Sequence, residues 1–305
     1  MPSTSTATTD LVTGAFGNTG RVITAGLVGK GHRVRTLTDH PDPAADPEQV
    51  EALPHAWGDP SRLAEAFEGI TTLYNTYWMR LGDASGRYET ATDRCIQLID
   101  AAAGAGVERI VHISVAHPSL DSPYPYFRGK AEVEAHLKGV GVPWAAVRPA
   151  LVFGGDSVLL NNLAWLLRRL PVFALAAGGD YRVRPVHVDD LARICVEAGA
   201  RDVDETIDAV GPERPTFRQL VTEVRDAVGA RTRLVGLPAR LVLPASRALG
   251  MVLRDDLLSR HELLSTVEGL ADTAGQATGT IEVSRWLTEH SSELGREYVN
   301  ERRRR

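Results

Sequence analysis

The chain has 305 residues, of which 43% are hydrophobic and 24% charged, so it can bury a large core and has the balance of a soluble globular protein. Its formal net charge of −5 argues against the broad basic face that nucleic-acid binding usually needs. No apolar run approaches the roughly 20 residues of a membrane span. We therefore expect neither a nucleic-acid partner nor a membrane partner.

The amino-terminal stretch MPSTSTATTD lacks the basic segment and apolar core of a secretory signal. Cys95 and Cys195 stand alone in apolar periodic segments, without the paired spacing of a redox motif or a metal site. Free thiols of this kind are typical of a reducing compartment. These features predict a cytoplasmic protein. The nearest approach to a membrane span, residues 241–253, is interrupted by Pro244 and Arg247.

From residue 10 to about 150, short β-branched runs alternate with longer helical patterns. The runs DLVTGA, RVRTLT, TTLYNTY, RIVHIS and WAAVRPALVFG predict strands, and helices are expected between them. Strands that alternate with helices of this length form crossover units, in which a parallel sheet is covered on both faces. The predicted fold class is therefore α/β, a Rossmann-type doubly wound parallel sheet.

This alternation ends after Gly155. The segment NNLAWLLRRLPVFAL predicts a helix with one apolar stripe, RVRPVHVDDLARICVEAG predicts a strand and a capped helix, and ETIDAVG predicts another strand. Helical patterns then continue to the end, with a Gly/Thr-rich break at residues 271–280. We predict a nucleotide-binding domain over residues 1–155, its sheet completed by later strands, and a smaller, mainly helical lobe over residues 156–305.

A glycine loop joins the first predicted strand to the first helix. The run LVTGAFGNTG places its three glycines where they allow a tight turn, a close approach to a pyrophosphate and close helix–strand packing. The helix N-terminus offers unpaired N–H groups and a partial positive charge to the phosphates. In this strand–loop–helix context the motif predicts a dinucleotide site. The loop residues expected to contact the cofactor are Gly14, Phe16, Gly17, Asn18, Thr19 and Gly20.

An acidic residue follows the second predicted strand, in TLTDHPDP. A carboxylate at this position accepts hydrogen bonds from the ribose hydroxyls and repels the 2′-phosphate of NADP, so Asp39 favours NAD. Three nearby cations, Arg21, Arg35 and His40, could still hold that phosphate. Asp39 could also be a turn residue before Pro41. The expected cofactor is NAD or NADP, with NAD favoured.

Two more segments place polar or aromatic groups after predicted strands. Asp59 could accept a hydrogen bond from the adenine amine, or it could cap a helix that begins at Pro60. The run YNTYWMR presents Asn75, Tyr77 and Trp78 at the carboxyl end of a strand, where ligands bind in open α/β sheets. We expect Asn75 to contact the cofactor. The aromatic pair either lines the substrate pocket or packs in the core.

Tyr126 and Lys130 are four residues apart in PYPYFRGKAE. On a helix that begins near Tyr126, the two side chains share one face. A free tyrosine, with a pKa of about 10, is a poor acid–base group at neutral pH, but a lysine ammonium one turn away favours the phenolate. The tyrosine can then exchange a proton with a carbonyl or alcohol oxygen while hydride moves at carbon. In a dinucleotide sheet the pair predicts a catalytic site.

The segments GAFGNTG, YFRGK, VRPALVFGG and RPVHVDDLA together resemble those of short-chain dehydrogenase/reductases of the extended or atypical kind, the NAD(P)-binding epimerase/dehydratase-like group. The resemblance implies that Tyr126 is the acid–base residue and that Lys130 holds the nicotinamide ribose. It also implies that the segment RPALVFG, with Pro149 and Val152, passes the nicotinamide. HVDDLA matches a structural stretch of the family that leads into a helix.

One catalytic position departs from the family pattern. The family places a Ser or Thr at the end of the fifth strand, usually as the second residue of a pair, but this strand ends HISVAHPS. Ser114 fills the first slot and Val115 the second. Ser114 could donate to the substrate oxygen, Ser119 could reach in from the loop, or that oxygen could lack this donor. Losing one such hydrogen bond costs on the order of 100-fold in rate.

Two other patterns have simpler explanations. His187, Asp189 and Asp190 could suggest metal ligands, but a strand that ends in an N-capping Asp explains them, and no metal site is expected. Apolar stripes near the end of the chain, which include Leu263 and Trp286, predict either lobe core or a surface for a homo-oligomer.

Three functions are consistent with this sequence. The first is an NAD(P)-dependent oxidoreductase that acts on a carbonyl or alcohol of a small organic molecule. The second is an epimerase or dehydratase that oxidises its substrate transiently and shows no net cofactor turnover. The third is a non-catalytic NAD(P)-binding protein, such as a redox sensor or an assembly partner. Val115 supports the third function, and the intact Tyr126–Lys130 pair opposes it.

Overall fold

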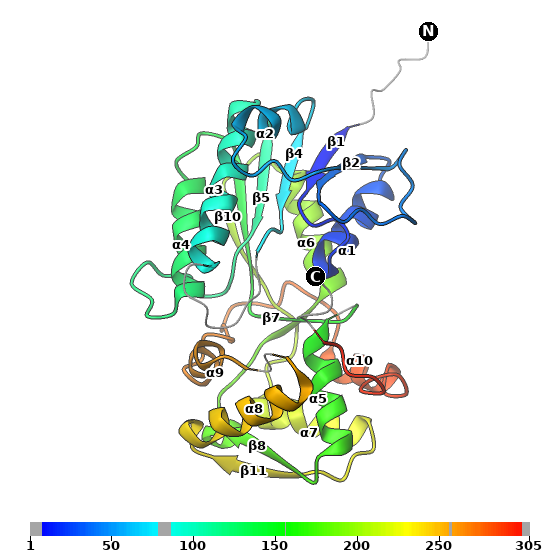
Figure 1. The fold of residues 1–305 in the computed structure, drawn as a ribbon, viewed down its shortest axis with the longest axis vertical. Coiled ribbons are helices and arrows are strands. Elements are labelled where there is room, and N and C mark those ends of the chain that lie inside the picture. The colour runs from blue at the N-terminus through cyan, green and yellow to red at the C-terminus, as the bar shows by residue number, and fades with distance from the viewer. Residues whose placement is uncertain (1–7, 79–86, 156, 256–257, 301–305) are drawn as a thin grey trace. The chain divides into compact units, whose positions relative to one another are not determined.

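The computed structural model describes residues 8–78, 87–155, 157–255 and 258–300. These residues form two compact units (Figure 1). The first unit takes residues 8–78, 87–149 and 191–207, and the second takes residues 150–190 and 208–300. The first unit ends at residue 149, close to the boundary expected at residue 155, and residues 191–207 return to it, in a fold whose sheet was expected to be completed by later strands. Among the helices of the described residues, none has the length and apolar character needed to cross a membrane.

The first unit is built on a seven-stranded sheet in the order β10-β6-β5-β4-β1-β2-β3 (Figure 1). Neighbouring strands from β6 to β3 pair in parallel. The strand order changes direction between β1 and β4, which is the switch point of a doubly wound sheet. The predicted fold class is confirmed. The strands are β1 (Thr9–Val12), β2 (Arg33–Leu37), β3 (Val50–Leu53), β4 (Thr72–Asn75), β5 (Arg109–Ile113), β6 (Trp144–Pro149) and β10 (Glu205–Ala209).

Helices cover both faces of this sheet (Figure 1). On one face, α2, α3 and α4 close a core of fully buried side chains such as Phe67, Ile99 and Ile110. On the other face α1 lies against α6, where Gly26 would bring an added Cβ within 3.5 Å of Val196. The helices are α1 (Asn18–Val28), α2 (Pro60–Ala66), α3 (Arg87–Gly104), α4 (Pro125–Leu137) and α6 (Val188–Gly199).

Short parallel strand pairs and helices organise the second unit. β7 (Leu151–Phe153) pairs with β9 (Pro185–His187), and β8 (Val172–Ala176) pairs with β11 (Arg233–Leu237). A second apolar core, with Phe153, Leu220 and Leu287 among its members, joins these strands to the helices. The helices are α5 (Val158–Arg169), α7 (Phe217–Ala227), α8 (Ala239–Leu253), α9 (Arg260–Val267) and α10 (Val283–Glu289).

The prediction of a single helix over NNLAWLLRRLPVFAL is wrong. Helix α5 ends at Arg169, and Leu170 is already extended, with φ −91° and ψ 135°. Pro171 lacks the N–H that a helix needs and disfavours helical backbone in the residue before it. The rest of the segment forms β8, and β11 was not predicted either. Both strands are short apolar runs, which periodicity alone does not separate from helix.

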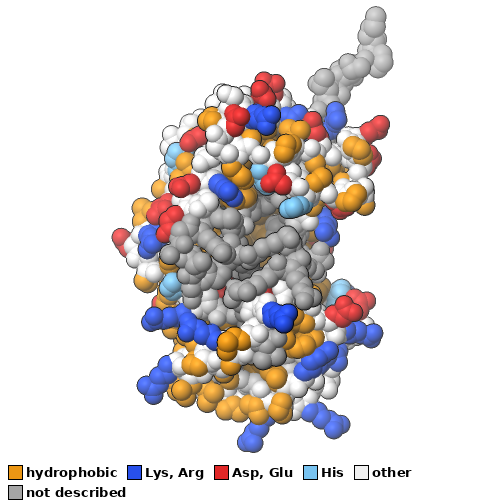
Figure 2. Space-filling model, in the orientation of Figure 1, with side chains coloured by type: hydrophobic (Ala, Val, Ile, Leu, Met, Phe, Trp, Pro, Cys, Tyr) orange, Lys and Arg blue, Asp and Glu red, His pale blue; other side chains and the backbone are white. Residues whose placement is uncertain are grey.

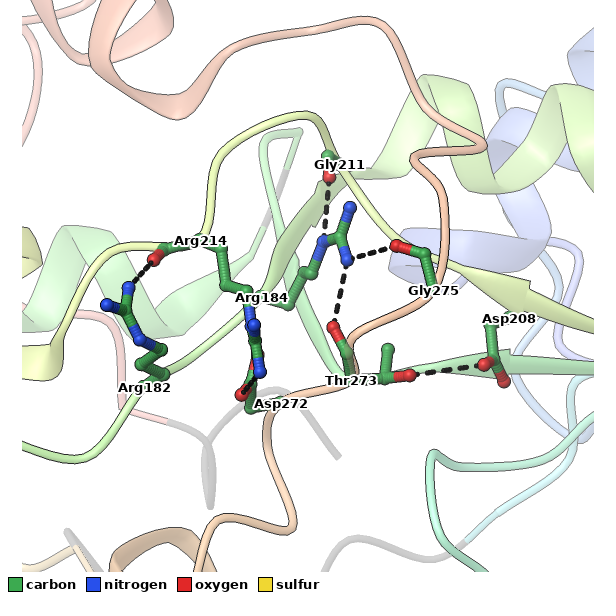
Figure 3. A network of polar contacts seen from close by, with 8 residues as sticks. All are labelled: Arg182, Arg184, Asp208, Gly211, Arg214, Asp272, Thr273 and Gly275. Atoms are coloured by element: carbon green, nitrogen blue, oxygen red, sulfur yellow. Dashed lines mark hydrogen bonds and ion pairs between the residues drawn. The ribbon is translucent and has the colours of Figure 1, made fainter.

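A network of polar contacts fixes the Gly/Thr-rich break of the second unit (Figure 3). Arg184 is 6% exposed, and its guanidinium donates to the carbonyls of Gly211, Thr273 and Gly275. Beside it, Arg214 forms a two-point ion pair with Asp272, with both distances 2.6 Å. Buried donors that each meet an acceptor avoid a desolvation penalty. These contacts hold the segment after residue 270 in one conformation.

Candidate cofactor and catalytic site

The glycine loop has the backbone geometry of a dinucleotide-binding turn. Gly14 has φ +66°, a left-handed conformation that residues with a Cβ rarely adopt. The N–H of Gly17 donates to the carbonyl oxygen of Gly14 at 2.8 Å and closes the turn. A Cβ on Gly20 would lie 2.0 Å from that same oxygen, so only glycine fits there. The loop therefore brings α1 close to β1 and leaves Gly14 and Gly17 exposed for a ligand.

The N-terminus of α1 has the features of an anion-binding site. No side chain caps the helix at Gly17, and its first turn carries no acidic residue. In contrast, Thr216 and Gln219 close a full capping box at the start of α7. The partial positive charge at the start of α1 thus fits a pyrophosphate. Phe16, Asn18 and Thr19 are half-buried around this point, as a cofactor-lining loop requires.

Thr13, which the sequence analysis did not single out, ties the glycine loop to the end of β4. Its hydroxyl donates to Asn75 Oδ1 at 3.3 Å and accepts from the N–H groups of Thr76 and Tyr77 at 2.8 and 2.9 Å. Thr76 Oγ1 in turn donates to the Thr13 carbonyl. Asn75 is fully buried by this arrangement. A threonine directly before the first glycine was the signal available in the sequence.

The structure places Asp39 beyond the end of β2, exposed, with Oδ1 accepting from the backbone N–H of His55 at 3.1 Å. Its other oxygen has no protein donor in the described part of the chain. Arg35, one of the cations proposed for a 2′-phosphate, is already engaged with Glu51 and with the carbonyls of Ala66 and Glu68. Because these contacts engage the Arg35 guanidinium, Arg35 is less available to bind a 2′-phosphate. This arrangement favours the role predicted for Asp39.

Asp59 caps α2, as one of its two predicted roles requires. Its Oδ1 accepts from the N–H of Arg62 at 3.2 Å, and Pro60 occupies the first turn. The cap uses one carboxylate oxygen and leaves the side chain half exposed, at 52%. A hydrogen bond to an adenine amine is compatible with this arrangement and stays a prediction.

Tyr77 and Trp78 have separate environments. The Tyr77 hydroxyl accepts from Arg94 at 2.8 Å, and its ring lies against Trp57 with 5.1 Å between centroids. Burial raises the pKa of Tyr77, although the Arg94 guanidinium opposes the shift. Tyr77 therefore has a structural place in an aromatic cluster with Trp57, next to Arg94 of α3. Trp78 instead lies over Lys130, with the amine 4.1 Å from the ring centroid.

Tyr126 and Lys130 both lie on α4, one turn apart, as predicted. The Tyr126 ring meets the edge of Trp78 at 5.5 Å between centroids and lies 6.2 Å from Tyr88. Lys130 is 2% exposed, and its amine donates to the carbonyl of Ile113 at 2.7 Å. Burial lowers the pKa of Lys130 from 10.5 to about 8, while Cys95 and Glu134 partly oppose this shift. The site thus holds an amine that gives up its proton more readily than a free lysine does.

The end of β5 carries a second buried polar group beside Lys130. His112 is fully buried, and neither of its ring nitrogens has a hydrogen-bond partner in the described chain. Burial lowers the pKa of His112 well below its usual value, and the nearby Lys130 charge adds to this effect. The ring is therefore neutral at pH 7. Sequence analysis missed His112, because a histidine within a strand gives no signal of full burial.

Ser114 lies two residues after His112, so its side chain leaves the same face of the sheet. It is 2% exposed, and its hydroxyl has no partner among the described residues. Val115, in the slot of the usual Ser or Thr, is also buried. Ser119 is exposed, and its hydroxyl accepts from the N–H of Asp121 at 3.3 Å. Ser114 is thus a buried hydroxyl next to Ile113, whose carbonyl binds Lys130, whereas Ser119 is a residue of the exposed loop.

The last two predicted cofactor contacts belong to different units. Pro149 ends β6, and its carbonyl accepts from the N–H of Ala116 at 3.0 Å, which places it next to the residues after β5. Val152 lies on β7 of the second unit, where it pairs with Val186. Its predicted contact with the nicotinamide stays a prediction.

The predicted N-capping role of an Asp after β9 is wrong. Helix α6 begins at Val188, and His187 Nδ1 accepts from the N–H of Asp189 at 3.2 Å. Asp190 instead accepts from the N–H groups of Thr280 and Ile281, both at 2.8 Å. The carboxylate therefore anchors a segment distant in sequence, which local capping rules do not anticipate.

His187 and Asp189 also line a cavity of about 760 Å³ in the second unit, with the stacked rings of Trp286 and His290 on another wall. Within the described chain, no group of three or more His, Cys, Asp or Glu side chains could hold a metal ion. The described residues therefore give no support to the metal reading of these side chains.

Comparisons with known proteins agree with this geometry. Residues 14–161 match the family described as NAD(P)H-binding. The chain is 29% identical over 236 residues to (4-alkanoyl-5-oxo-2,5-dihydrofuran-3-yl)methyl phosphate reductase from Streptomyces griseus, an alignment that covers 75% of each protein. It is 30% identical over 148 residues to the photosystem II assembly factor Ycf39 of Cyanophora paradoxa, which covers 48% of this chain and 46% of that protein.

An uncharacterized protein from Mycobacterium tuberculosis is 31% identical over 213 residues. That alignment covers 68% of this chain but only 22% of the relative, so the chain spans about a fifth of that protein's length. Among solved structures, Citrobacter triphenylmethane reductase complexed with NADP(H) superposes with a TM-score of 0.71, covering 93% of this chain and 99% of that one at 16% identity. A nucleoside-diphosphate-sugar epimerase from Staphylococcus aureus gives 0.71, with 92% and 99% covered at 16% identity.

The glycine loop, the uncapped start of α1 and the switch point of the sheet define an NAD(P)H-binding protein with a Rossmann-type fold. More particularly, the chain has the fold of the epimerase and reductase structures with which it superposes. Its cofactor is NAD or NADP.

Proposed function

We propose that the protein is an NAD(P)H-dependent oxidoreductase that transfers hydride to or from a carbonyl or alcohol carbon of a small organic molecule. The observation that carries this proposal is the pair on α4: a half-buried Tyr126 beside a buried Lys130 whose amine is held at 2.7 Å by the Ile113 carbonyl. Burial of an ammonium group whose direct contacts are neutral destabilises the fold, so packing alone does not explain a lysine at this position. Binding of a ligand by Lys130 would explain why the protein keeps this destabilising group.

Tyr126 is the proton donor or acceptor in this proposal. Lys130 lies one helical turn away from it on α4, so both side chains can reach the same substrate and cofactor. The tyrosine hydroxyl would protonate a substrate carbonyl oxygen, or take the proton of an alcohol, as hydride moves at the adjacent carbon. The bound nicotinamide supplies or accepts that hydride. Trp78 packs against both side chains of the pair and limits the access of water to them.

Ser114 supplies the second contact to the substrate oxygen. Its hydroxyl is buried without a protein partner in the described residues, so it is available to a ligand. Because Val115 offers no hydroxyl at the position of the usual Ser or Thr, Ser114 takes that role in this proposal. The Streptomyces relative is named a reductase, and the alignment with this chain covers 75% of its length. This similarity supports the oxidoreductase assignment.

The test uses stopped-flow absorbance of the reduced nicotinamide with a panel of ketones, aldehydes and conjugated lactones. Tyr126→Phe should lower the rate of hydride transfer by about 10²-fold or more, because it removes only the acid–base hydroxyl. Tyr88→Phe is the matched control, since its ring lies 6.2 Å from that of Tyr126 and should leave the rate within a few-fold. Full activity in Tyr126→Phe would refute the proposal. An epimerase would instead convert substrate with no net change in absorbance.

Cofactor choice has its own test, by calorimetry with NADH and NADPH. If Asp39 reads the ribose, NADH should bind more tightly, and Asp39→Ala should narrow the difference by about tenfold through the loss of one charge-assisted hydrogen bond. The backbone contact to His55 is lost as well, so the thermal midpoint of the variant should be recorded as a control. Tighter NADPH binding to the parent protein contradicts the assignment.

A second candidate function is that of a non-catalytic NAD(P)H-binding protein. It is suggested by the valine at the position where a hydroxyl donor is expected. Val115 is 5% exposed and cannot donate to a substrate, and the Cyanophora relative is named an assembly factor. This candidate predicts that Lys130→Met weakens cofactor binding while no substrate of the panel is turned over. Turnover that depends on Tyr126 eliminates it.

A further inference from the structure

Helix α8 exposes an apolar stripe. Its inner side packs with β8 and α9 through Val242 and Leu243. On its outer side, Leu241 is 52% exposed and Met251 is 76% exposed. The exposed positions between them continue the stripe at the three-to-four-residue spacing of a helix surface. These intervening exposed residues are Pro244, Ala245 and Ala248.

A row of arginines runs along the same helix. Arg240 and Arg247 are seven residues apart on α8, close to two helical turns, and Arg254 follows at the same interval as the residue that caps the helix, so the three lie along one side of the stripe. All three are exposed, and none has a carboxylate partner in the described chain. Exposed arginines elsewhere are paired along their own helices, as in Arg193–Glu197 and Arg285–Glu289. We call the apolar stripe and this row together the α8 surface.

The segment that contains α8, residues 227–254, has a net positive charge, whereas the whole chain has a net negative charge. Residues 227–254 contain five arginines and no Asp or Glu, in a protein whose net charge is −5. In register on the sheet under α8, Val172 is 50% exposed beside the exposed Arg233. Figure 2 shows hydrophobic side chains gathered where Figure 1 places α8 and β8, with Lys and Arg side chains around them. The region is therefore both apolar and strongly cationic.

We propose that the α8 surface binds an anionic lipid bilayer, with α8 lying in the plane of the membrane interface. A helix with one apolar face, a basic flank and no acidic residue is the pattern of interfacial membrane helices. The evenly spaced guanidinium groups, about 10 Å apart along the helix, match a plane of phosphate headgroups rather than a single point ligand. The apolar side chains between them enter the boundary of the acyl chains.

A second copy of this chain fits the surface less well than a bilayer does. A twofold interface through α8 would place the same arginine row on both sides, and like charges across an interface disfavour association. The proposal goes beyond the catalytic function and is independent of it. It also departs from the expectation of no membrane partner, which rested on the lack of a spanning segment and did not consider binding in the interface.

Co-sedimentation of the full chain with vesicles tests this proposal. Vesicles of phosphatidylcholine mixed with phosphatidylglycerol should retain the protein, and vesicles of phosphatidylcholine alone should not. Binding should weaken as salt is raised, because the headgroup attraction is screened. No binding to the anionic vesicles, or equal binding to both kinds, overturns the proposal.

Substitutions on the α8 surface measure separately how much charge and apolar contact contribute to vesicle binding. Arg240→Gln with Arg247→Gln should lower the partition coefficient by about 25-fold, or about fivefold for each arginine near an anionic surface. Lys30→Gln with Arg33→Gln removes the same charge from exposed residues of the first unit and should have no such effect. Leu241→Asp should also reduce binding, whereas Val203→Asp, at a similar 54% exposure, should not. Equal loss in the control variants contradicts a specific surface.

Two further outcomes would contradict the proposal. If analytical ultracentrifugation shows a dimer that Leu241→Asp dissociates, α8 is an interface between copies and the proposal is wrong. If soluble polyglutamate releases the protein from vesicles and Leu241→Asp binds them as well as the parent does, charge alone explains the binding. Circular dichroism confirms that each variant is folded, as expected for substitutions at exposed positions.

Discussion

Helices α4 and α8 depart from the ordinary amphipathic pattern in opposite ways. Helix α4 buries charged side chains, since Lys130 is 2% exposed and Glu134 is 3% exposed. Helix α8 exposes apolar ones, since more than half of Leu241 and Met251 is accessible. Both arrangements lower stability relative to a helix that buries only apolar groups. We propose a different use for this cost in each helix, catalysis for α4 and binding to a partner for α8.

The two buried charges of α4 also differ from each other. Glu134 meets Arg148 of β6 in a two-point ion pair, with distances of 2.8 and 2.5 Å. The direct contacts of the Lys130 amine among the described residues are the Ile113 carbonyl and the face of Trp78, both of which are neutral. A buried charge with a full partner is structural, whereas one with a neutral partner keeps the capacity to titrate and to bind. The comparison therefore assigns a stabilising role to Glu134 and agrees with the catalytic role proposed for Lys130.

Among substitutions on α4, the largest expected effect on stability tests the structural member of that pair. Glu134→Ala should lower the free energy of unfolding by about 3 kcal/mol, because it leaves Arg148 without its carboxylate in a largely buried place. Glu132→Ala is the matched control on the same helix: its pair with Arg128 is exposed and 4.0 Å long, so the change should stay within about 0.5 kcal/mol. Urea unfolding followed by circular dichroism measures both. Equal effects would remove the distinction between buried and exposed charge on α4.

The next effect concerns Lys130 and depends on pH. Its folded pKa of about 8 lies below the unfolded value of 10.5, so above pH 8 the folded protein has released a proton that the unfolded chain still holds. Stability due to this group therefore rises with pH through that window. The Lys130→Met variant should lack this rise and should be at least as stable as the parent near pH 7. Subtracting the two unfolding curves between pH 7 and 9 gives the contribution of this group alone, and a flat difference contradicts a buried, depressed lysine.

The smallest expected effect tests α8. Leu241→Asp should change the free energy of unfolding by no more than about 0.5 kcal/mol, because the side chain already faces solvent. Val242→Asp, one residue further along, should destabilise the protein by several kcal/mol, since Val242 is 8% exposed in the core beneath α8. Thermal melts of both variants check this order. A large loss in Leu241→Asp would show that the stripe is covered within the protein itself.

The sequence by itself determined the nucleotide-binding half of the fold and the class of the site. The glycine loop and the alternation of strands and helices are local patterns, and each follows from backbone sterics or from side-chain periodicity. The spacing of Tyr126 and Lys130 also specified that they share a face, because helical geometry is fixed. These features needed no knowledge of which segments meet in space.

The tertiary structure decided everything that depends on distant segments. It showed that Arg35 is occupied by Glu51, that His112 is buried beside Lys130, and that Asp190 binds the backbone at residues 280 and 281 instead of capping a helix. It also separated the strand β8 from α5 and showed which side of α8 faces solvent. Burial sets the pKa of a lysine and the exposure of a leucine, and burial is a property of the packed chain rather than of any segment within it.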